Sequence, residues 1–203
     1  MLGCPVTQLL GCLVARLLHC LATRLFNCSA ARLLSHLAAQ FLGCSIARLL
    51  GCSLVQLLGC SAAALFSYSV TMLLGCSTVQ LLGQSVAGLL RCWAAWLPGC
   101  STVRLLGCPV VRLLGCSTFW LLGCSAALLF GCSTAPLLGC SAAPWLLHCS
   151  AVRLLGCSAA LLFGCSKAAG LFGCSTVQLL CCSAVPRLLD CLAAPLFSCF
   201  TDA

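Results

Sequence analysis

Cysteine is the residue type with the most chemical potential in this sequence, with 23 cysteines among 203 residues. They recur every eight residues, as at Cys44, Cys52 and Cys60. Zinc sites usually take pairs separated by two to four residues, so this spacing does not match them. On an α-helix, sulfurs eight residues apart lie about 12 Å apart along the axis, too far for a disulfide. In a β-solenoid, equivalent positions stack about 4.8 Å apart, and a ladder of cysteines becomes possible.

Catalysis requires titratable groups that converge in space, and this chain offers few. The only acids are Asp190 and Asp202, and the three histidines stand where the pattern of the chain otherwise has Gly or Cys. His148 and Cys149 have the residue types of a nucleophilic pair, but sequence neighbours rarely form one. The sequence therefore predicts no enzymatic activity, with no catalytic, cofactor-binding or metal-ligating residue and no cofactor.

The elements that position these side chains come from an eight-residue unit, of which Leu73–Gln80 (Leu-Leu-Gly-Cys-Ser-Thr-Val-Gln) is one copy. Twenty-five copies fill the chain, and those ending at Trp145, Gly170 and Arg187 carry one extra residue. The first position is Leu in 23 of the 25 copies and the fourth is Cys in 22. We predict one array over 1–203, degenerate over 1–40, regular over 41–144 and degenerate over 145–203.

The eighth position of the octad varies without regard to size or polarity. It takes Gln, Arg, Trp, Pro, Leu, Gly, Ala and Met. Arg, Gln, Trp, Pro and Leu are all one base away from a CGG codon, so drift of single bases explains most of the set. One interpretation is therefore that the chain translates a decaying 24-base tandem DNA repeat, with no selected function and no stable fold.

Two folds compete for the octad. On an α-helix each copy is rotated by about 80° from the last, so the leucines spiral around the axis and the helix is apolar all round. As a strand, a period of eight keeps every position on one face, and Gly-Cys-Ser would form the corners of a β-solenoid. The adjacent leucines break strict alternation, and Leu and Ala favour helix. We predict a mainly α repeat protein of apolar helices or helical hairpins, with a β-solenoid or no stable fold as alternatives.

Composition favours contact with lipid or with other chains. Hydrophobic residues make up 63% of the sequence and charged residues 6%, against about 45–50% and about 25% in typical soluble domains. Leu49–Leu90 is uncharged, and Leu113–Ser150 lies in a second uncharged run. Each run can hold a helical hairpin across a bilayer, with bends near 67–69 and 131–133. We expect a membrane location; otherwise the chain is intracellular, because 1–20 resembles no secretory signal.

The net charge of +8 reflects a shortage of acids more than a dense cationic surface. Nine arginines and one lysine are spread thinly, whereas nucleic-acid-binding proteins cluster their basic residues. We expect a bilayer or self-association as the partner, and neither nucleic acid nor a small-molecule substrate. The main hypothesis is a non-enzymatic, low-complexity, hydrophobic Leu/Cys octapeptide-repeat protein associated with membranes. The alternatives are the translated DNA repeat and a soluble structural solenoid with a Cys ladder.

Overall fold

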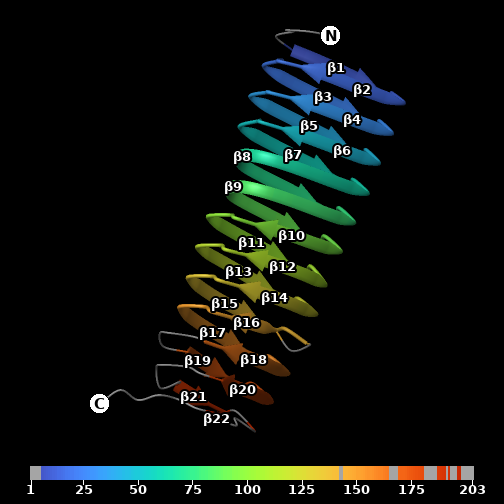
Figure 1. Ribbon diagram of the computed structural model, residues 1–203. Coiled ribbons are helices and arrows are strands. Elements are labelled where there is room, and N and C mark those ends of the chain that lie inside the picture. The colour runs from blue at the N-terminus through green and yellow to red at the C-terminus, as the bar shows by residue number, and fades with distance from the viewer. Residues whose placement is uncertain are drawn as a thin grey trace. The chain divides into compact units, whose positions relative to one another are not determined.

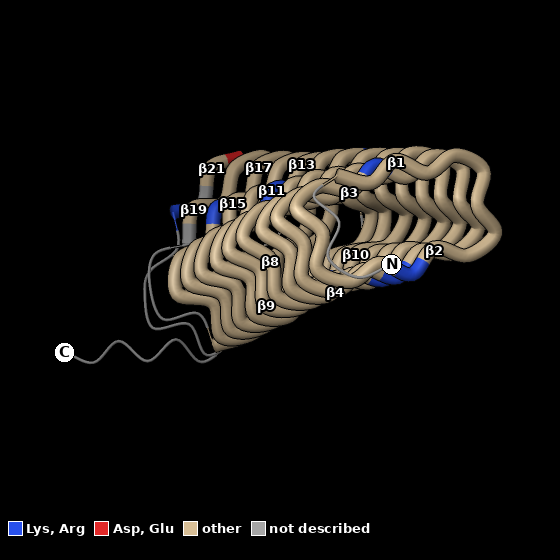
Figure 2. The backbone as a smooth tube through the Cα atoms, turned by 90° about the horizontal axis from the view of Figure 1, so that it is seen from above, with Lys and Arg blue, Asp and Glu red and all other residues tan. Residues whose placement is uncertain are grey.

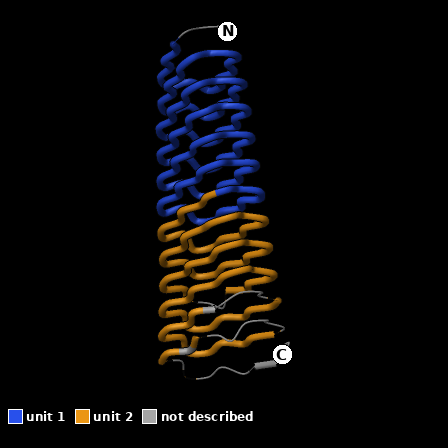
Figure 3. Tube along the Cα trace, turned by 90° about the vertical axis from the view of Figure 1, so that its left-hand side faces the viewer, with its two compact units in different colours: residues 1–101 blue, residues 102–203 orange. Residues whose placement is uncertain are grey.

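A computed structural model describes residues 6–141, 144–164, 169–180, 187–190, 192 and 196–197. Two compact units divide the chain, residues 1–101 and residues 102–203, and each is described here by itself (Figure 3). The described residues form strands joined by short turns, without a helix (Figure 1). The prediction of a mainly α protein is therefore wrong, and its alternative, the β-solenoid, is confirmed.

The strands of unit 1 are β1 (Val6–Leu10), β2 (Val14–Leu18), β3 (Ala22–Phe26), β4 (Ala30–Leu34), β5 (Ala38–Leu42), β6 (Ile46–Leu50), β7 (Leu54–Leu58), β8 (Ala62–Leu74), β9 (Thr78–Leu90) and β10 (Ala94–Pro98). Those described in unit 2 are β11 (Thr102–Leu106), β12 (Val110–Leu114), β13 (Thr118–Leu122), β14 (Ala126–Phe130), β15 (Thr134–Leu138), β16 (Trp145–Leu147), β17 (Ala151–Leu155), β18 (Ala159–Phe163), β19 (Ala169–Phe172), β20 (Thr176–Leu180), β21 (Arg187–Leu189) and β22 (Leu196–Phe197).

One solenoid turn consists of two octads. A typical strand pairs in parallel with the next strand but one, so Val6 of β1 lies beside Ala22 of β3, and Val14 of β2 lies beside Ala30 of β4. The odd-numbered and even-numbered short strands thus form two separate parallel stacks within each unit. The long strands β8 and β9 run through a corner and belong to both stacks of unit 1.

Backbone hydrogen bonds continue through the corners between the strands. The Gly43 amide donates to the Leu58 carbonyl at 2.9 Å, and the Ser45 amide donates to the Cys28 carbonyl at 3.1 Å. Corner residues of one turn are therefore hydrogen-bonded to those of the next, as the strands are. This satisfies backbone groups that a buried loop would leave unpaired, so the octad can repeat without irregular segments.

Each octad position keeps one orientation on every turn. Side chains alternate between the inner and outer face along a strand, and this alternation begins again at the same octad position after each corner. The first (Leu), fourth (Cys) and seventh (Val, Ala or Thr) positions point into the core, and the others point outward. The leucine pair shows the rule: Leu57 is 0% exposed, whereas its neighbour Leu58 is 39% exposed. The pair breaks strict alternation of apolar and polar residues and still fits a strand, because adjacent strand residues face opposite sides and here the outward side is apolar as well.

The third position of the octad turns the corner with a positive φ. Fifteen described glycines have a positive φ, of 60° to 69°, which glycine adopts without steric cost. Non-glycine residues hold the same conformation at other corners, among them Arg91 with φ 55°.

We expect Arg91→Gly to stabilise the protein by about 1 kcal/mol, because a side chain in the left-handed region costs about 1–2 kcal/mol. Denaturant unfolding of both proteins measures the difference. Gly75→Arg is the reciprocal control at an equivalent corner, where φ is 65° and a Cβ would meet nothing within 4 Å. That variant should lose a similar amount, and a gain in its stability would contradict the strained corner.

Single extra residues do not interrupt the stacking in unit 2. The register there lengthens from 16 residues, as between Thr118 and Thr134, to 17 residues, as between Thr134 and Ala151. The copies predicted to carry insertions thus still place Trp145, Gly170 and Arg187 within strands.

The uncharged runs are not helical hairpins. The run Leu49–Leu90 falls on β6 to β9, and its predicted bend at 67–69 lies inside the continuous strand β8. The run Leu113–Ser150 falls on strands and corners as well, apart from 142–143, which lie outside the described residues. In the part of the chain that the structure describes, no helix has the length and apolar character needed to cross a bilayer.

Candidate functional site: core thiols, outer columns and grooves

The cysteines line the core at the solenoid corners. The 17 cysteines of the described residues are free thiols, and all but Cys12 are buried. Most lie near the carbonyl two residues earlier, so that the Cys28 sulfur is 3.6 Å from the Phe26 oxygen and the Cys116 sulfur 3.9 Å from the Leu114 oxygen. Weak S–H···O contacts of this kind let a thiol pack like a small apolar side chain in a tight corner.

Thiols of successive turns stack into columns and interact. Cys60 contacts Cys76, and Cys140 contacts Cys157. Burial raises the pKa of the Cys44 and Cys52 thiols, and burial together with the nearby Cys108 raises the pKa of Cys124 to about 11. Hydrogen bonds from neighbouring thiols lower the pKa of Cys76, Cys140 and Cys149, so the columns hold thiols shifted in both directions. The protonated, buried thiols are poor nucleophiles and poor metal ligands.

The described residues contain no group of three Cys, His, Asp or Glu side chains arranged to hold a metal ion. A straight column also presents its sulfurs in a line and cannot surround a tetrahedral ion. In the described part of the chain the cysteines stack in columns but are not joined, so the predicted ladder of disulfides is not formed there. Cys181 and Cys182, the only adjacent cysteines, lie outside the described residues.

His148 and Cys149 do not form a reactive pair. Cys149 is buried, and its sulfur lies 3.7 Å from the Leu147 oxygen, whereas His148 is exposed at the corner. The imidazole instead packs edge-on between two phenylalanines, with ring centroids 5.8 Å from Phe130 and 6.2 Å from Phe163. Neighbouring residues at a solenoid corner point to opposite sides of the wall, which separates the two groups.

Three larger polar residues replace cysteine in the fourth position: His36, Tyr68 and Gln84. All three are buried, and each keeps one polar atom without a hydrogen-bond partner: His36 Nδ1, the Tyr68 hydroxyl and Gln84 Oε1. Burial raises the pKa of Tyr68, with a further contribution from the adjacent Cys52 thiol. A buried polar atom without a partner costs about 1–3 kcal/mol, so these residues weaken the core and do not form a polar site.

We expect Gln84→Cys to stabilise the protein by about 1–2 kcal/mol, because it removes the unpaired Oε1 and restores the side chain of the other corners. The amide nitrogen of Gln84 keeps a bond to the Leu82 carbonyl at 3.2 Å, which limits the gain. Denaturant unfolding under reducing conditions measures it. Gln80→Cys, at an exposed strand position of the same sheet, is the matched control and should change stability little. Destabilisation by Gln84→Cys would contradict the assigned core position.

The outer surface of each unit carries two regular columns. The second octad position forms what we call the leucine columns, one on each stack. Their exposed members in unit 1 are Leu10, Leu34, Leu42, Leu50, Leu58, Phe66, Leu74, Leu82 and Leu90. Those in unit 2 are Leu106, Leu114, Leu122, Phe130, Leu155, Phe163 and Leu189.

The eighth position forms the second outer column. On β2, β4 and β6 it stacks Arg16, Arg32 and Arg48 in register, and all three are exposed. On β5 and β7 it stacks two glutamines, whose side chains are joined by a hydrogen bond of 3.1 Å from Gln40 Nε2 to Gln56 Oε1. Charged segments are nevertheless few on the backbone as a whole (Figure 2). An outward position explains why this column tolerates so many residue types, and the origin from a DNA repeat stays a prediction.

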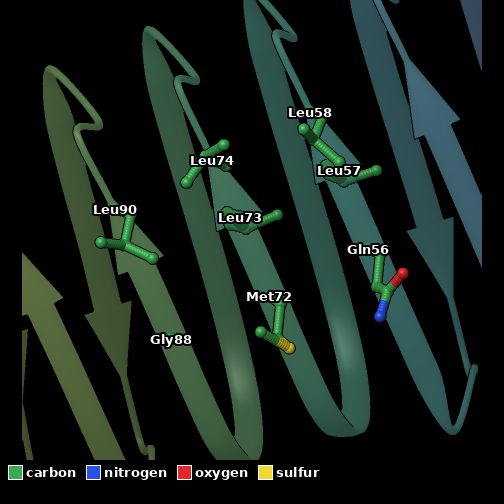
Figure 4. A pocket seen from close by; sticks show the side chains of 8 residues that line it. All are labelled: Gln56, Leu57, Leu58, Met72, Leu73, Leu74, Gly88 and Leu90. Atoms are coloured by element: carbon green, nitrogen blue, oxygen red, sulfur yellow. The ribbon is translucent and has the colours of Figure 1, made fainter.

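Small residues in the eighth position open grooves in the outer surface. In unit 1, Gly88 leaves an apolar groove of about 270 Å³ between Met72 and the leucine column, as Figure 4 shows. In unit 2, Pro136 and Gly170 interrupt the column and leave a groove of about 730 Å³ that reaches from Trp120 to Arg187. Sequence reasoning missed both grooves, because residues 16 or 17 apart become neighbours only once two octads are known to complete a turn.

No family model, no curated protein and no solved structure is found to match this chain.

Proposed function

We propose that this chain is a non-enzymatic structural protein, a repeat solenoid whose leucine columns pack against a second copy of the same chain. The supporting observation is that the outward second position is leucine or phenylalanine on successive turns of both units, interrupted by Pro98 on β10. Scattered exposed leucines are ordinary on protein surfaces, but continuous apolar rows mark surfaces that contact another molecule.

A second copy is the partner that fits these rows best. Rungs of any copy repeat about every 4.8 Å, so the side chains of two facing sheets can interdigitate along the whole row. The net charge of +8 opposes the contact, so screening by salt should strengthen it.

The test is sedimentation of the full chain under reducing conditions. We expect a concentration-dependent dimer or larger species that grows as salt is raised. The triple variant Leu42→Ser, Leu58→Ser and Leu74→Ser, which interrupts one leucine column of unit 1, should weaken association at least tenfold. The matched control Gln40→Ser, Gln56→Ser and Met72→Ser changes the neighbouring column of the same strands. Equal effects of the two triple variants, or a monomer at all concentrations, would overturn the proposal.

A membrane surface is the second candidate for the same columns. The observation in its favour is the arginine stack Arg16, Arg32 and Arg48, which lies on the same strands as the second-position leucines Leu18, Leu34 and Leu50. Leucines entering the lipid interface with arginines at the headgroups would bind anionic vesicles, and salt would weaken that binding. Co-sedimentation with anionic and neutral vesicles separates the two partners, because salt acts on them in opposite directions.

A further inference from the structure

The large groove of unit 2 interrupts the eighth-position column of the odd-numbered strands. Along this column the structure places Pro136 beside Arg153, Arg153 beside Gly170, and Gly170 beside Arg187. The two arginines are exposed and stand two rungs apart, at about 10 Å between backbones, and Gly170 on the rung between them has no side chain of its own. Flexible arginine side chains can close on a group held between them across that gap.

Packing around Gly170 shapes the space between the arginines. A Cβ added to Gly170 would lie 3.8 Å from the Arg153 Cγ and 3.3 Å from a ring carbon of Phe172. The gap is thus bordered by the aliphatic part of Arg153 on one side and an aromatic ring on the other. These surroundings suit a ligand with a charged head group joined to an apolar body.

The other end of the groove is lined mostly by apolar residues, together with Thr118 and Thr134. Pro136 lies beyond Arg153, and past it stands Trp120, whose side chain is 61% exposed. From Gly170 to Trp120 the groove crosses three rungs, or about 14 Å. The volume of about 730 Å³ lies within the range of about 300–1,000 Å³ typical of small-molecule sites.

Charge determines the class of ligand. The whole chain has ten basic residues and only two acidic ones, so most arginines can have no carboxylate side chain as a partner within it. Two guanidinium groups on either side of one gap attract a carboxylate, sulfate or phosphate group, to which each can donate two hydrogen bonds. The apolar continuation toward Trp120 favours a hydrocarbon body over a hydrated polyanion.

We propose that this groove binds an anionic amphiphile of the fatty-acid class, with its head group over Gly170 between Arg153 and Arg187 and its chain along Pro136 to Trp120. Packing against a second copy is a separate property of the leucine columns, and neither proposal requires the other.

Binding of dodecanoate to the full chain, measured by calorimetry below its micelle concentration, is the direct test. We expect saturable binding that is weakened at least tenfold in Arg153→Gln and in Arg187→Gln. Arg112→Gln removes the same charge from the even-numbered stack of unit 2 and should change the affinity less than twofold. Gly170→Gln fills the gap with a side chain and should abolish binding; its Cβ would lie 3.3 Å from a Phe172 ring carbon, so denaturant unfolding checks that the variant folds like the wild type.

A second readout locates the chain of the ligand. Dodecanoate brominated near its terminal carbon should quench tryptophan fluorescence, and Trp120→Phe should remove that quenching although Trp93, Trp96 and Trp145 remain. Decanol tests the role of the charge: its affinity should not respond to the arginine variants. Equal losses in Arg112→Gln and Arg153→Gln, unsaturable uptake, or quenching that survives Trp120→Phe would each overturn the site. Sedimentation of Gly170→Gln alongside the wild type keeps this outcome distinct from any change in self-association.

Discussion

Replacing Leu57 by alanine should destabilise the protein by about 3–5 kcal/mol, whereas the same change at Leu58 should cost less than about 1 kcal/mol. The two leucines are sequence neighbours of identical chemistry, but Leu57 is 0% exposed and Leu58 is 39% exposed. Removing three buried carbons at Leu57 loses transfer free energy and leaves a cavity, and close neighbours on the stacked turns limit its collapse. Denaturant unfolding of both variants under reducing conditions measures the difference.

The same experiment can be repeated in unit 2 with Leu121, 0% exposed, and Leu122, 45% exposed. The prediction depends on orientation alone, so composition, helix propensity and chain length are matched within each pair. An apolar helix that spirals through lipid would treat both leucines of a pair alike. Similar losses at Leu57 and Leu58 would therefore contradict the inward and outward assignment of the octad positions.

Raising the pH from about 8 to about 10.5 should destabilise the protein, because thiols whose pKa is raised by burial resist ionisation in the folded chain. The lowered pKa of Cys76, Cys140 and Cys149, caused by hydrogen bonds from neighbouring thiols, offsets part of the loss. Burial, with Cys108 nearby, raises the pKa of Cys124 from 9.0 to about 11, and burial raises the pKa of Cys44 and Cys52 in the same direction. Above pH 9 the unfolded chain loses these protons and the folded chain keeps them. Stability is therefore complete below about pH 9 and is lost as the pH rises toward the folded-state value. At pH 10.5 Cys124 alone accounts for at most about 2 kcal/mol.

Few other groups can produce this effect, because the chain has one tyrosine and one lysine and arginine stays protonated. Unfolding curves at several pH values, with a reductant present, give the change in the free energy of unfolding with pH. Cys124→Ala should lessen the alkaline loss while lowering stability at neutral pH slightly. Stability that stays constant from about pH 8 to about pH 10.5 would show that the thiols are solvated, and the stacked core would then be wrong.

The sequence specified the repeat and its columns but not the choice between helix and strand. Period eight is a multiple of two, so the prediction that each octad position keeps one face in a strand, with Gly-Cys-Ser at the corners, is confirmed for the β-solenoid alternative. The main prediction was wrong because it relied on the helix propensity of Leu and Ala. The free-energy differences in helix propensity are small compared with the free energy gained by burying a leucine in every octad. The glycine in most copies received too little weight against helix propensity: Gly fits recurring corners, where Gly43 has a positive φ, better than helix interiors.

The grooves and outer columns could not be predicted without the length of a turn. A solenoid of two octads brings Arg153 beside Gly170, whereas one of three octads would choose other neighbours. The single-residue insertions make the neighbours harder to predict, because they lengthen the register from 16 to 17 residues without breaking the stack. Sequence alone thus predicted the composition of each column but left open which members of a column touch.

A zero-length cross-link between two stacked side chains tests the solenoid most directly. Gln40 and Gln56 stand on β5 and β7 and share a hydrogen bond of 3.1 Å, so carbodiimide should join the introduced carboxylate and amine of the double variant Gln40→Glu, Gln56→Lys. Background is low, because the chain has only two acids and one lysine. The control Gln40→Glu, Arg48→Lys places the amine on β6, in the other stack. We predict a cross-linked peptide joining positions 40 and 56 and none joining 40 and 48. A helix would hold 40 and 56 about 24 Å apart, so the absence of the first cross-link, or equal yields of both, would contradict the solenoid.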